Sequence, residues 1–312
     1  MDVLPVEVIE LIFLAACCDG GRMAGSIRAT CKTFRDISDA CRFRTVAIAS
    51  ENQALSFRDA FRQASPTAQA SMRHLFVMVP GESQSGIATA EEIVRSVAQS
   101  LETLTCVVTP AIRGHLGIML RLVSTVTQFP QLRALTLRCD DGGVLGDDFT
   151  TPEAGILFPR LQYLHLAHRA MAPFTVIHRA VDYLKTCAGS HLRRVTISGG
   201  TCMKRGDLSD FREMLLFPKR QLPGNSPPWS ALCPLQTYIL EPYYFIESFR
   251  RGLTDLEKET REREGAIRLV LLPRCARIPW QKRMEEWLLV RAGELDPLHE
   301  WPEDIPWTGV NP

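Results

Sequence analysis

The stretch FPQLRALTL, residues 129–137, returns 29 residues later as FPRLQYLHL, residues 158–166. In both copies a Phe-Pro pair leads into apolar anchors spaced as apolar, two free positions, apolar, one free position, apolar. The last two anchors are separated by one residue and therefore lie on one face of an extended strand, because successive side chains of a strand point to opposite faces. The two copies predict two equivalent strands, each with its last two anchors buried.

The same anchor pattern recurs along most of the chain, at intervals of 29, 29, 31, 29, 31, 43 and 31 residues. The copies are Phe43-Val46-Ile48, Met72-Leu75-Val77, Leu101-Leu104-Cys106, Leu132-Leu135-Leu137, Leu161-Leu164-Leu166, Leu192-Val195-Ile197, Leu235-Tyr238-Leu240 and Ala266-Leu269-Leu271. One unit repeated at a near-constant period is typical of a solenoid. We therefore expect an α/β fold over residues 43–275, a solenoid of about eight units with a parallel inner sheet and outer helices.

Stretches with helical periodicity lie between the strands, over residues 88–100, 114–129 and 173–187. Thr89 followed by Glu92 predicts a capping box in the first of them. The long interval holds an insertion within residues 204–231, whose prolines and basic residues favour a surface loop, either partner-binding or disordered. Residues 244–264 are rich in charges at i,i+4 spacing, which favours a solvated helix without a partner.

Strand residues that alternate with the buried anchors predict a recognition surface for a target protein. Its candidate residues are Phe76, Met78, Arg138, Tyr163, His165, Arg194, Glu241 and Arg268, several of them types enriched at interfaces. Phe76 and Met78 also allow another interpretation, because exposed apolar side chains on a sheet are unfavourable. In that alternative a loop or the chain's own tail covers the first strands.

The C-terminal region, residues 276–312, does not continue the repeat. Residues 280–291 suit a helix with Met284, Trp287 and Leu288 on its apolar side, and we expect this helix to cap the solenoid. The tail over residues 296–312 is rich in proline and acidic residues. Its two tryptophans allow it to dock on the inner strand face, while its composition is otherwise typical of disorder.

Residues 1–42 lie before the first repeat and form a separate unit. Leu4-Pro5 sets a helix start, and the residues that follow are apolar around much of the helix surface. A segment of this length cannot bury so apolar a helix by itself. It therefore needs a cover, which is either the solenoid or another protein chain.

The opening LPVEVIELIF, residues 4–13, and the later SIRATCKTFRDI, residues 26–37, resemble the F-box, and the repeats resemble the leucine-rich repeats of F-box proteins. The resemblance implies a three-helix F-box-like module followed by a leucine-rich-repeat solenoid. It further implies a substrate-recognition subunit of an SCF-type ubiquitin ligase, which binds a Skp-type adaptor, and through it a cullin, and presents a target protein whose identity is unknown. By matching position, the adaptor-binding and packing residues are Leu4, Pro5, Val8, Ile9, Ile12, Phe13, Cys31, Phe34 and Ile37.

An alternative is a leucine-rich-repeat scaffold with no ubiquitin role, in which the N-terminal helices cap the solenoid. In neither interpretation does the chain carry out chemistry itself. No catalytic or metal-ligating pattern is evident, so we expect a non-catalytic subunit without cofactor or metal. His165 and His168, for example, lie three apart in a strand and so face opposite sides.

Composition narrows the partners and the compartment. The net charge of +1 argues against nucleic acid and against an anionic membrane, since both require clustered Lys and Arg. The ten cysteines include no C-x-x-C pair and favour a reduced, intracellular protein. Residues 8–18 resemble an export signal but contain Glu10 and lack a basic start. We therefore expect a cytoplasmic or nuclear location.

Overall fold

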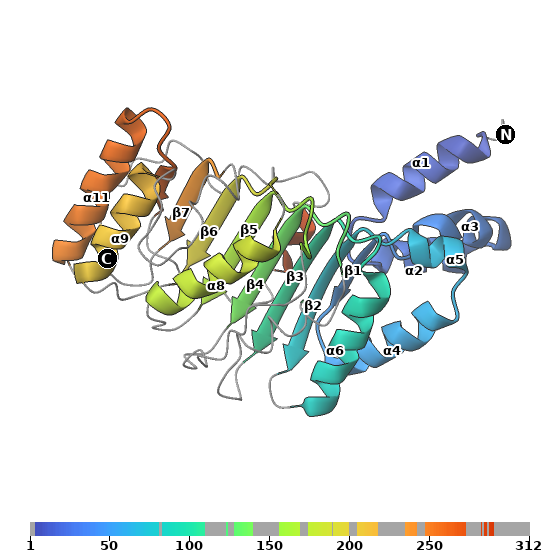
Figure 1. The fold of residues 1–312 in the computed structure, drawn as a ribbon. Helices are drawn as coiled ribbons and strands as arrows, with labels where there is room; N and C mark the ends of the chain where they lie inside the picture. Colours follow the sequence, from blue (N-terminus) through green and yellow to red (C-terminus); the bar gives the residue numbers. More distant parts are fainter. Residues whose placement is uncertain are drawn as a thin grey trace.

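Eight strands form a single all-parallel sheet in the computed structural model, and their order in the sheet is their order in the chain (Figure 1). The strands are β1 Thr45–Ile48, β2 His74–Pro80, β3 Thr103–Thr109, β4 Ala134–Cys139, β5 Tyr163–His168, β6 Arg194–Ser198, β7 Thr237–Glu241 and β8 Arg268–Leu271. The structure describes residues 4–80, 83–109, 123, 128–139, 156–168, 174–188, 190–199, 205–217, 235–241, 247–272, 282, 284–285 and 287–289. One strand per repeat and parallel pairing of neighbours are confirmed.

The register of the sheet aligns equivalent positions of successive repeats. Leu104 pairs with Leu135, which pairs with Leu164, and the same row continues through Val195 and Tyr238. Because a shift of one residue would turn every anchor to the other face, this register is fixed by the burial of the anchors. The Phe-Pro lead-ins stack as well, with the rings of Phe129 and Phe158 centred 5.4 Å apart.

Helices cover one face of the sheet (Figure 1). They are α4 Glu51–Arg62, α6 Gln84–Val97, α8 Phe174–Cys187, α9 Arg205–Leu216 and α11 Glu247–Glu262, with the short α5 Pro66–Ala70 near the N-terminal end. Serine side chains begin three of them: Ser50, Ser65 and Ser83 each accept a hydrogen bond from a backbone N–H three residues on. The capping box expected at Thr89 is therefore wrong, because α6 begins at Ser83 and Thr89 is buried inside it.

The main core lies between the sheet and these helices. The inward anchors of the strands are buried there, except Leu271 of β8, which is half-buried, and the apolar stripes of α6 and α8 pack against them. Cys106 is one of these anchors and is fully buried, which raises the pKa of its thiol to about 12. The thiol thus behaves as a small apolar side chain that fills space in the core.

The residues expected to form a loop and a partnerless helix instead pack together. Within the inserted segment, α9 contributes Phe211 and Leu215 to the main core. Helix α11 packs against α9 and β8, with Leu253 buried and a 2.8 Å ion pair between Arg212 of α9 and Glu259. The prediction of a surface loop is wrong for the part of residues 204–231 that forms α9, because Phe211 and Leu215 lie on an apolar stripe of that helix. The expected helix is α11, whose outer residues Lys258, Arg261 and Glu262 are exposed while Leu253 is buried. The rest of the insertion lies outside the described residues.

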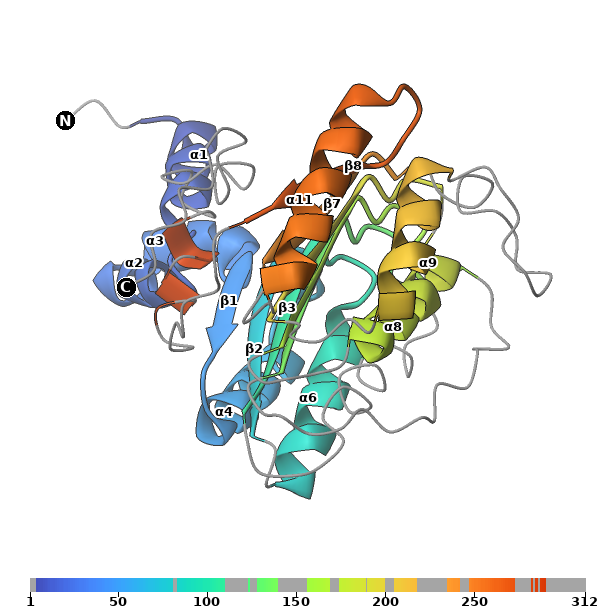
Figure 2. The same ribbon diagram turned by 90° about the vertical axis from the view of Figure 1, so that its left-hand side faces the viewer.

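The C-terminal helical residues cover the other face of the sheet. Lys282, Met284, Glu285 and Trp287–Leu289 are helical, and Figure 2 shows them on the side of the sheet away from α6, α8 and α9. Trp287 packs against Phe76 of β2 and Val107 of β3. The prediction that this helix caps the end of the solenoid is therefore corrected: its described residues lie across β1 to β3. The tail over residues 296–312 lies outside the described part.

The N-terminal residues fold as a group of short helices beside β1. They are α1 Val6–Ala16, α2 Arg22–Thr30, α3 Lys32–Ile37 and the 3-10 turn η1 Ser38–Cys41. We call these four elements the N-terminal module. Among the described residues, no helix is long and apolar enough to span a membrane.

Candidate functional site

The N-terminal module has a small core of its own. Phe13, Cys17, Ala24 and Cys41 are buried together, apart from the main core under the sheet. Partly buried apolar residues surround them, namely Ile9, Leu14, Ile27, Phe34 and Ile37. Because the module buries these side chains independently of the sheet, its surface is free to serve a different partner.

Aromatic and thiol contacts join α1 to α3 and to η1. The rings of Phe13 and Phe34 meet edge to face at 5.3 Å, a favoured arrangement for aromatic pairs. The sulfur atoms of Cys17 and Cys41 lie 3.8 Å apart as free thiols and share a hydrogen bond. This hydrogen bond and burial raise the pKa of Cys17 and keep its thiol protonated. The thiol therefore serves in packing and not as a nucleophile. At the start of α3, the Sγ of Cys31 accepts from the backbone N–H of Phe34.

Helix α1 leaves most of its apolar surface uncovered. Phe13 is its single buried residue, whereas Leu11 is 66% exposed and Ile12 is 49% exposed. Val8, Leu11 and Ile12 follow the spacing i, i+3, i+4 and so form one stripe along the helix, on the side away from Phe13. Leu4 extends this stripe beyond the helix start at Pro5, and it is exposed as well.

This stripe is the largest group of exposed apolar side chains on one element in the described part of the chain. The set of large exposed apolar residues there is Leu4, Val6, Val8, Leu11, Ile12, Met23, Ile156, Tyr163, Phe217 and Leu289, of which half belong to α1 and its lead-in. Figure 1 shows α1 projecting away from the sheet. A contiguous apolar surface of this kind is typical of a protein interface.

The predicted adaptor residues thus divide into two groups in the structure. Leu4, Pro5, Val8, Ile12 and Cys31 are exposed, while Phe13 is buried and Ile9, Phe34 and Ile37 are half-buried in the module. The first group can contact a partner, and the second holds α1 in place. Matching to the F-box positions did not identify Val6 and Leu11 as exposed apolar residues. The apolar composition of residues 4–13 was the sequence signal that could have identified them.

A polar network fixes the module against the body. The Arg28 guanidinium donates to the Asp39 carboxylate at 2.8 Å and to the carbonyl of Arg35 at 3.2 Å. The same carboxylate accepts from the hydroxyl of Ser65, at the start of α5. Asp39 therefore joins α2 and η1 of the module to the start of α5.

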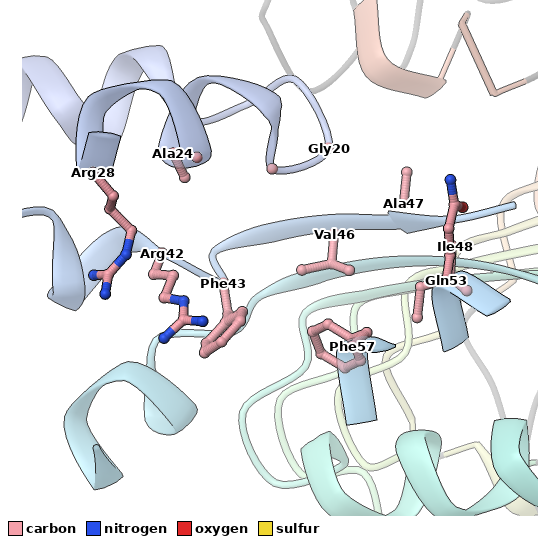
Figure 3. A pocket seen from close by; sticks show the side chains of 12 residues that line it. Gly20, Ala24, Arg28, Arg42, Phe43, Val46, Ala47, Ile48, Gln53 and Phe57 are labelled. Atoms are coloured by element: carbon pink, nitrogen blue, oxygen red, sulfur yellow. The ribbon is translucent and has the colours of Figure 1, made fainter. Parts of the chain in front are cut away.

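A cleft of about 380 Å³ lies between the module, β1 and α4 (Figure 3). Most of its walls are small or apolar, and the residues that line it are Gly20, Gly21, Ala24, Gly25, Arg28, Arg42, Phe43, Val46, Ala47, Ile48, Gln53 and Phe57. Figure 3 shows Arg28 and Arg42 together at one end. Burial, and then the charge of Arg28, lower the pKa of Arg42, and its guanidinium lies 4.6 Å from the ring of Phe43.

The predicted target-binding residues are dispersed in the structure. Phe76 is buried under Trp287, and Met78 packs against the same cluster. These two residues are therefore corrected from target contacts to intramolecular contacts, as in the alternative in which the chain covers its own first strands. The side chain of Glu241 lies outside the described part.

The remaining predicted target residues lie on β4, β5, β6 and β8. Tyr163 is 37% exposed, and the guanidinium of Arg194 on the next strand lies 6.0 Å from its ring. The ring of His165 is hydrogen-bonded at 2.8 Å to the Ser198 hydroxyl. Arg138 and Arg268 are half-buried. Tyr163 and Arg194 are thus in cation–π contact across neighbouring strands, whereas His165 is hydrogen-bonded to a residue of the next strand.

The comparisons with known proteins give no relative for this chain. No family model, no curated protein and no solved structure matches it. In the described residues, no three His, Cys, Asp or Glu side chains gather in a way that could hold a metal ion. The exposed stripe of α1 and the exposed Tyr163 of β5 are candidate surfaces for contact with other proteins.

Proposed function

We propose that this protein is the substrate-recognition subunit of an SCF-type ubiquitin ligase. The observation that carries the proposal is the exposed apolar stripe Leu4, Val8, Leu11 and Ile12 on a helix that the module supports from behind. Exposing four large apolar side chains is unfavourable, because burial of each stabilises by about 1.5–3 kcal/mol. A protein partner bound to this stripe would bury these side chains. Because residues 4–37 resemble an F-box, this partner is a Skp-type adaptor, and a cullin binds through the adaptor.

The proposal includes a leucine-rich-repeat solenoid as the fold of residues 43–275. The repeat period of about thirty residues, the sequential parallel sheet and the helices on its outer side support a leucine-rich-repeat solenoid. In that arrangement the strands beyond β3 present a surface to a target protein. The chain supplies no chemistry in this proposal, since it brings the target close to the transferring subunits and acts through proximity. The cytoplasm or nucleus is the compartment.

Adaptor binding by the purified chain tests the proposal directly. We expect a stable complex with a Skp-type adaptor, measured by titration calorimetry, and loss of that complex in the variant Leu11→Asp with Ile12→Asp. Both residues are exposed, so the variant retains its fold. Ile156→Asp is the matched control, because Ile156 is also an exposed apolar residue but lies outside the module. Absence of binding by the unmodified chain would refute the proposal.

A repeat scaffold without a ubiquitin role is the second candidate. It is favoured by the contact between the module and the sheet, in which the Ala47 N–H donates to the Gly20 carbonyl at 3.5 Å, as an end cap would do. The scaffold predicts that the stripe on α1 binds no adaptor. It also predicts that deletion of residues 1–42 lowers the unfolding temperature of the sheet while target binding by the strands is retained.

A further inference from the structure

The amino ends of the strands carry a row of arginines that the proposed function leaves unassigned. Arg73, Arg133 and Arg193 each stand immediately before a strand, and Arg194 and Arg268 open β6 and β8. We call these five residues, with Tyr163, the basic rim. We propose that the basic rim binds a peptide in the polyproline II conformation whose carboxylates are three residues apart. This inference rests on the proposed function, because it names the class of segment by which a target would be recognised.

Backbone hydrogen bonds place Arg133 and Arg193 in equivalent positions, and Tyr163 and Arg194 in the positions that follow them. The N–H groups of Arg133 and Ala134 both donate to the Glu102 carbonyl, and those of Gln162 and Tyr163 both donate to the Arg133 carbonyl. The next pair, Arg193 and Arg194, donates to the Gln162 carbonyl in the same way. The rim therefore follows one edge of the sheet, along the loops that lead into the strands in Figure 1.

The charges of Arg133 and Arg193 are not balanced by ion pairs within the described part of the chain. At the two positions that lead into each strand, the acidic residue is Glu102, and it is paired with Arg73 at 3.5 Å. Arg133 and Arg193 are exposed and form no ion pair within the described part of the chain. The whole chain has 36 basic and 35 acidic residues, so this excess of positive charge is a local feature of one edge. Local complementarity of this kind selects an acidic partner.

The spacing of the strands sets the spacing of the acids. Arg133 and Arg193 lead into β4 and β6, which are separated by β5. Neighbouring strands are about 4.8 Å apart, so the two arginines stand about 10 Å apart at the backbone. A peptide in the polyproline II conformation advances about 3.1 Å per residue and completes a turn in three residues, so carboxylates at i and i+3 lie on one side of it, about 9 Å apart, and match this distance. Each guanidinium can receive one carboxylate through two parallel hydrogen bonds.

Tyr163 adds an apolar contact beside this site. It lies on β5, one position after Gln162, which is the residue aligned between the two arginines, and its exposed ring has Arg194 beside it. A peptide that crosses from β4 to β6 would carry its two intermediate positions past this ring. An apolar residue at one of these positions is therefore favoured, because aromatic rings with a polar tip provide large contact areas at low entropic cost.

Fluorescence anisotropy with the full chain and two labelled peptides tests the inference without any adaptor. The peptides have the same composition, but the two glutamates are three apart in one and adjacent in the other. We expect the first peptide to bind about fivefold more tightly or better, since only it reaches both arginines. The variant Arg133→Glu with Arg193→Glu should lose this preference, whereas Arg95→Glu, an exposed arginine on α6, should retain it.

Three outcomes would overturn the inference. The first is equal affinity for the two peptides, and the second is loss of the preference in Arg95→Glu as well as in the double variant. The third is that a single-stranded oligonucleotide binds through Arg133 and Arg193 more tightly than the peptide. The last would make the rim a nucleic-acid site. Calorimetry with the adaptor is a separate measurement, so loss of peptide binding with adaptor binding intact refutes this inference alone. Peptide binding without adaptor binding would instead refute the proposed ligase role and leave an acidic-peptide site on a scaffold.

Discussion

The indole of Trp287 packs on the ring of Phe76, with the ring centroids 5.6 Å apart, although the two residues are more than two hundred positions apart in the chain. Val107 completes this cluster, and Met284 and Leu288 pack around it. The contact joins the C-terminal helical residues to the first strands. It therefore connects the two ends of the described chain on the face of the sheet that the other helices leave open.

Truncation of this indole should destabilise the sheet at its N-terminal end. Trp287→Ala removes a buried aromatic side chain and exposes Phe76, so we expect a loss of about 3–5 kcal/mol in the free energy of unfolding. Urea denaturation measures this loss. Leu289→Ala is the control because Leu289 is 38% exposed in the same helical segment, and its effect should be within about 0.5 kcal/mol. Similar losses in both variants would show that the cluster is not a specific contact.

The strands and their register could be predicted from the sequence because each depends on a local pattern. The pair Leu164 and Leu166, for example, has to face the core, and equivalent pairs recur at one period, so pairing and order follow. The cover over Phe76 could not be predicted in this way. Periodicity shows that a side chain needs burial, but the residue that buries it, Trp287, is remote in the chain and belongs to no repeat.

The candidate sites were predictable in part for a similar reason. Matched positions identified Val8 and Ile12 on α1 but missed Leu11, which is exposed because the module packs only the side of the helix that carries Phe13. The basic rim was missed except for Tyr163, Arg194 and Arg268. Arg133 and Arg193 precede their strands, so a list of outward strand positions passes over them, and only the ladder of backbone hydrogen bonds aligns them.

Two glycines of the module should respond in opposite directions to alanine. Gly20 has a φ of +77°, and an added Cβ would lie 3.0 Å from the Cβ of Ala47 and 3.2 Å from Leu288, so Gly20→Ala should cost roughly 1–2 kcal/mol. Gly25 lies in α2 with no atom near an added Cβ, so Gly25→Ala should stabilise by about 0.5–1 kcal/mol. Thermal unfolding of the two variants measures the difference, and equal effects would contradict the close junction between module and sheet.

The separate core of the module predicts that it can unfold while the sheet remains intact. Phe13→Ala leaves a cavity beside Phe34 and should remove about 3 kcal/mol or more from the stability of residues 4–41. Hydrogen exchange should then become faster in these residues and remain unchanged in β3 to β6. Phe158→Ala, in the main core, is the comparison, because it should accelerate exchange in the sheet. Faster exchange throughout the chain in Phe13→Ala would show that the two cores are one cooperative unit.

Burial of Cys106 makes the stability of the sheet depend on alkaline pH. Its thiol has an ordinary pKa of 9.0, and burial raises the pKa to about 12 in the folded chain. Between these values the unfolded chain loses the proton and the folded chain keeps it, so the folded state loses stability as pH rises. Relative to the unmodified chain, Cys106→Val should gain about 1 kcal/mol between pH 9 and pH 10, because it removes this titration. Urea denaturation of both chains at the two pH values measures the gain, and an unchanged difference would show that Cys106 ionises alike in both states.

Iodoacetamide provides an independent check: it should modify the exposed Cys31 in the native protein and reach Cys106 only after unfolding.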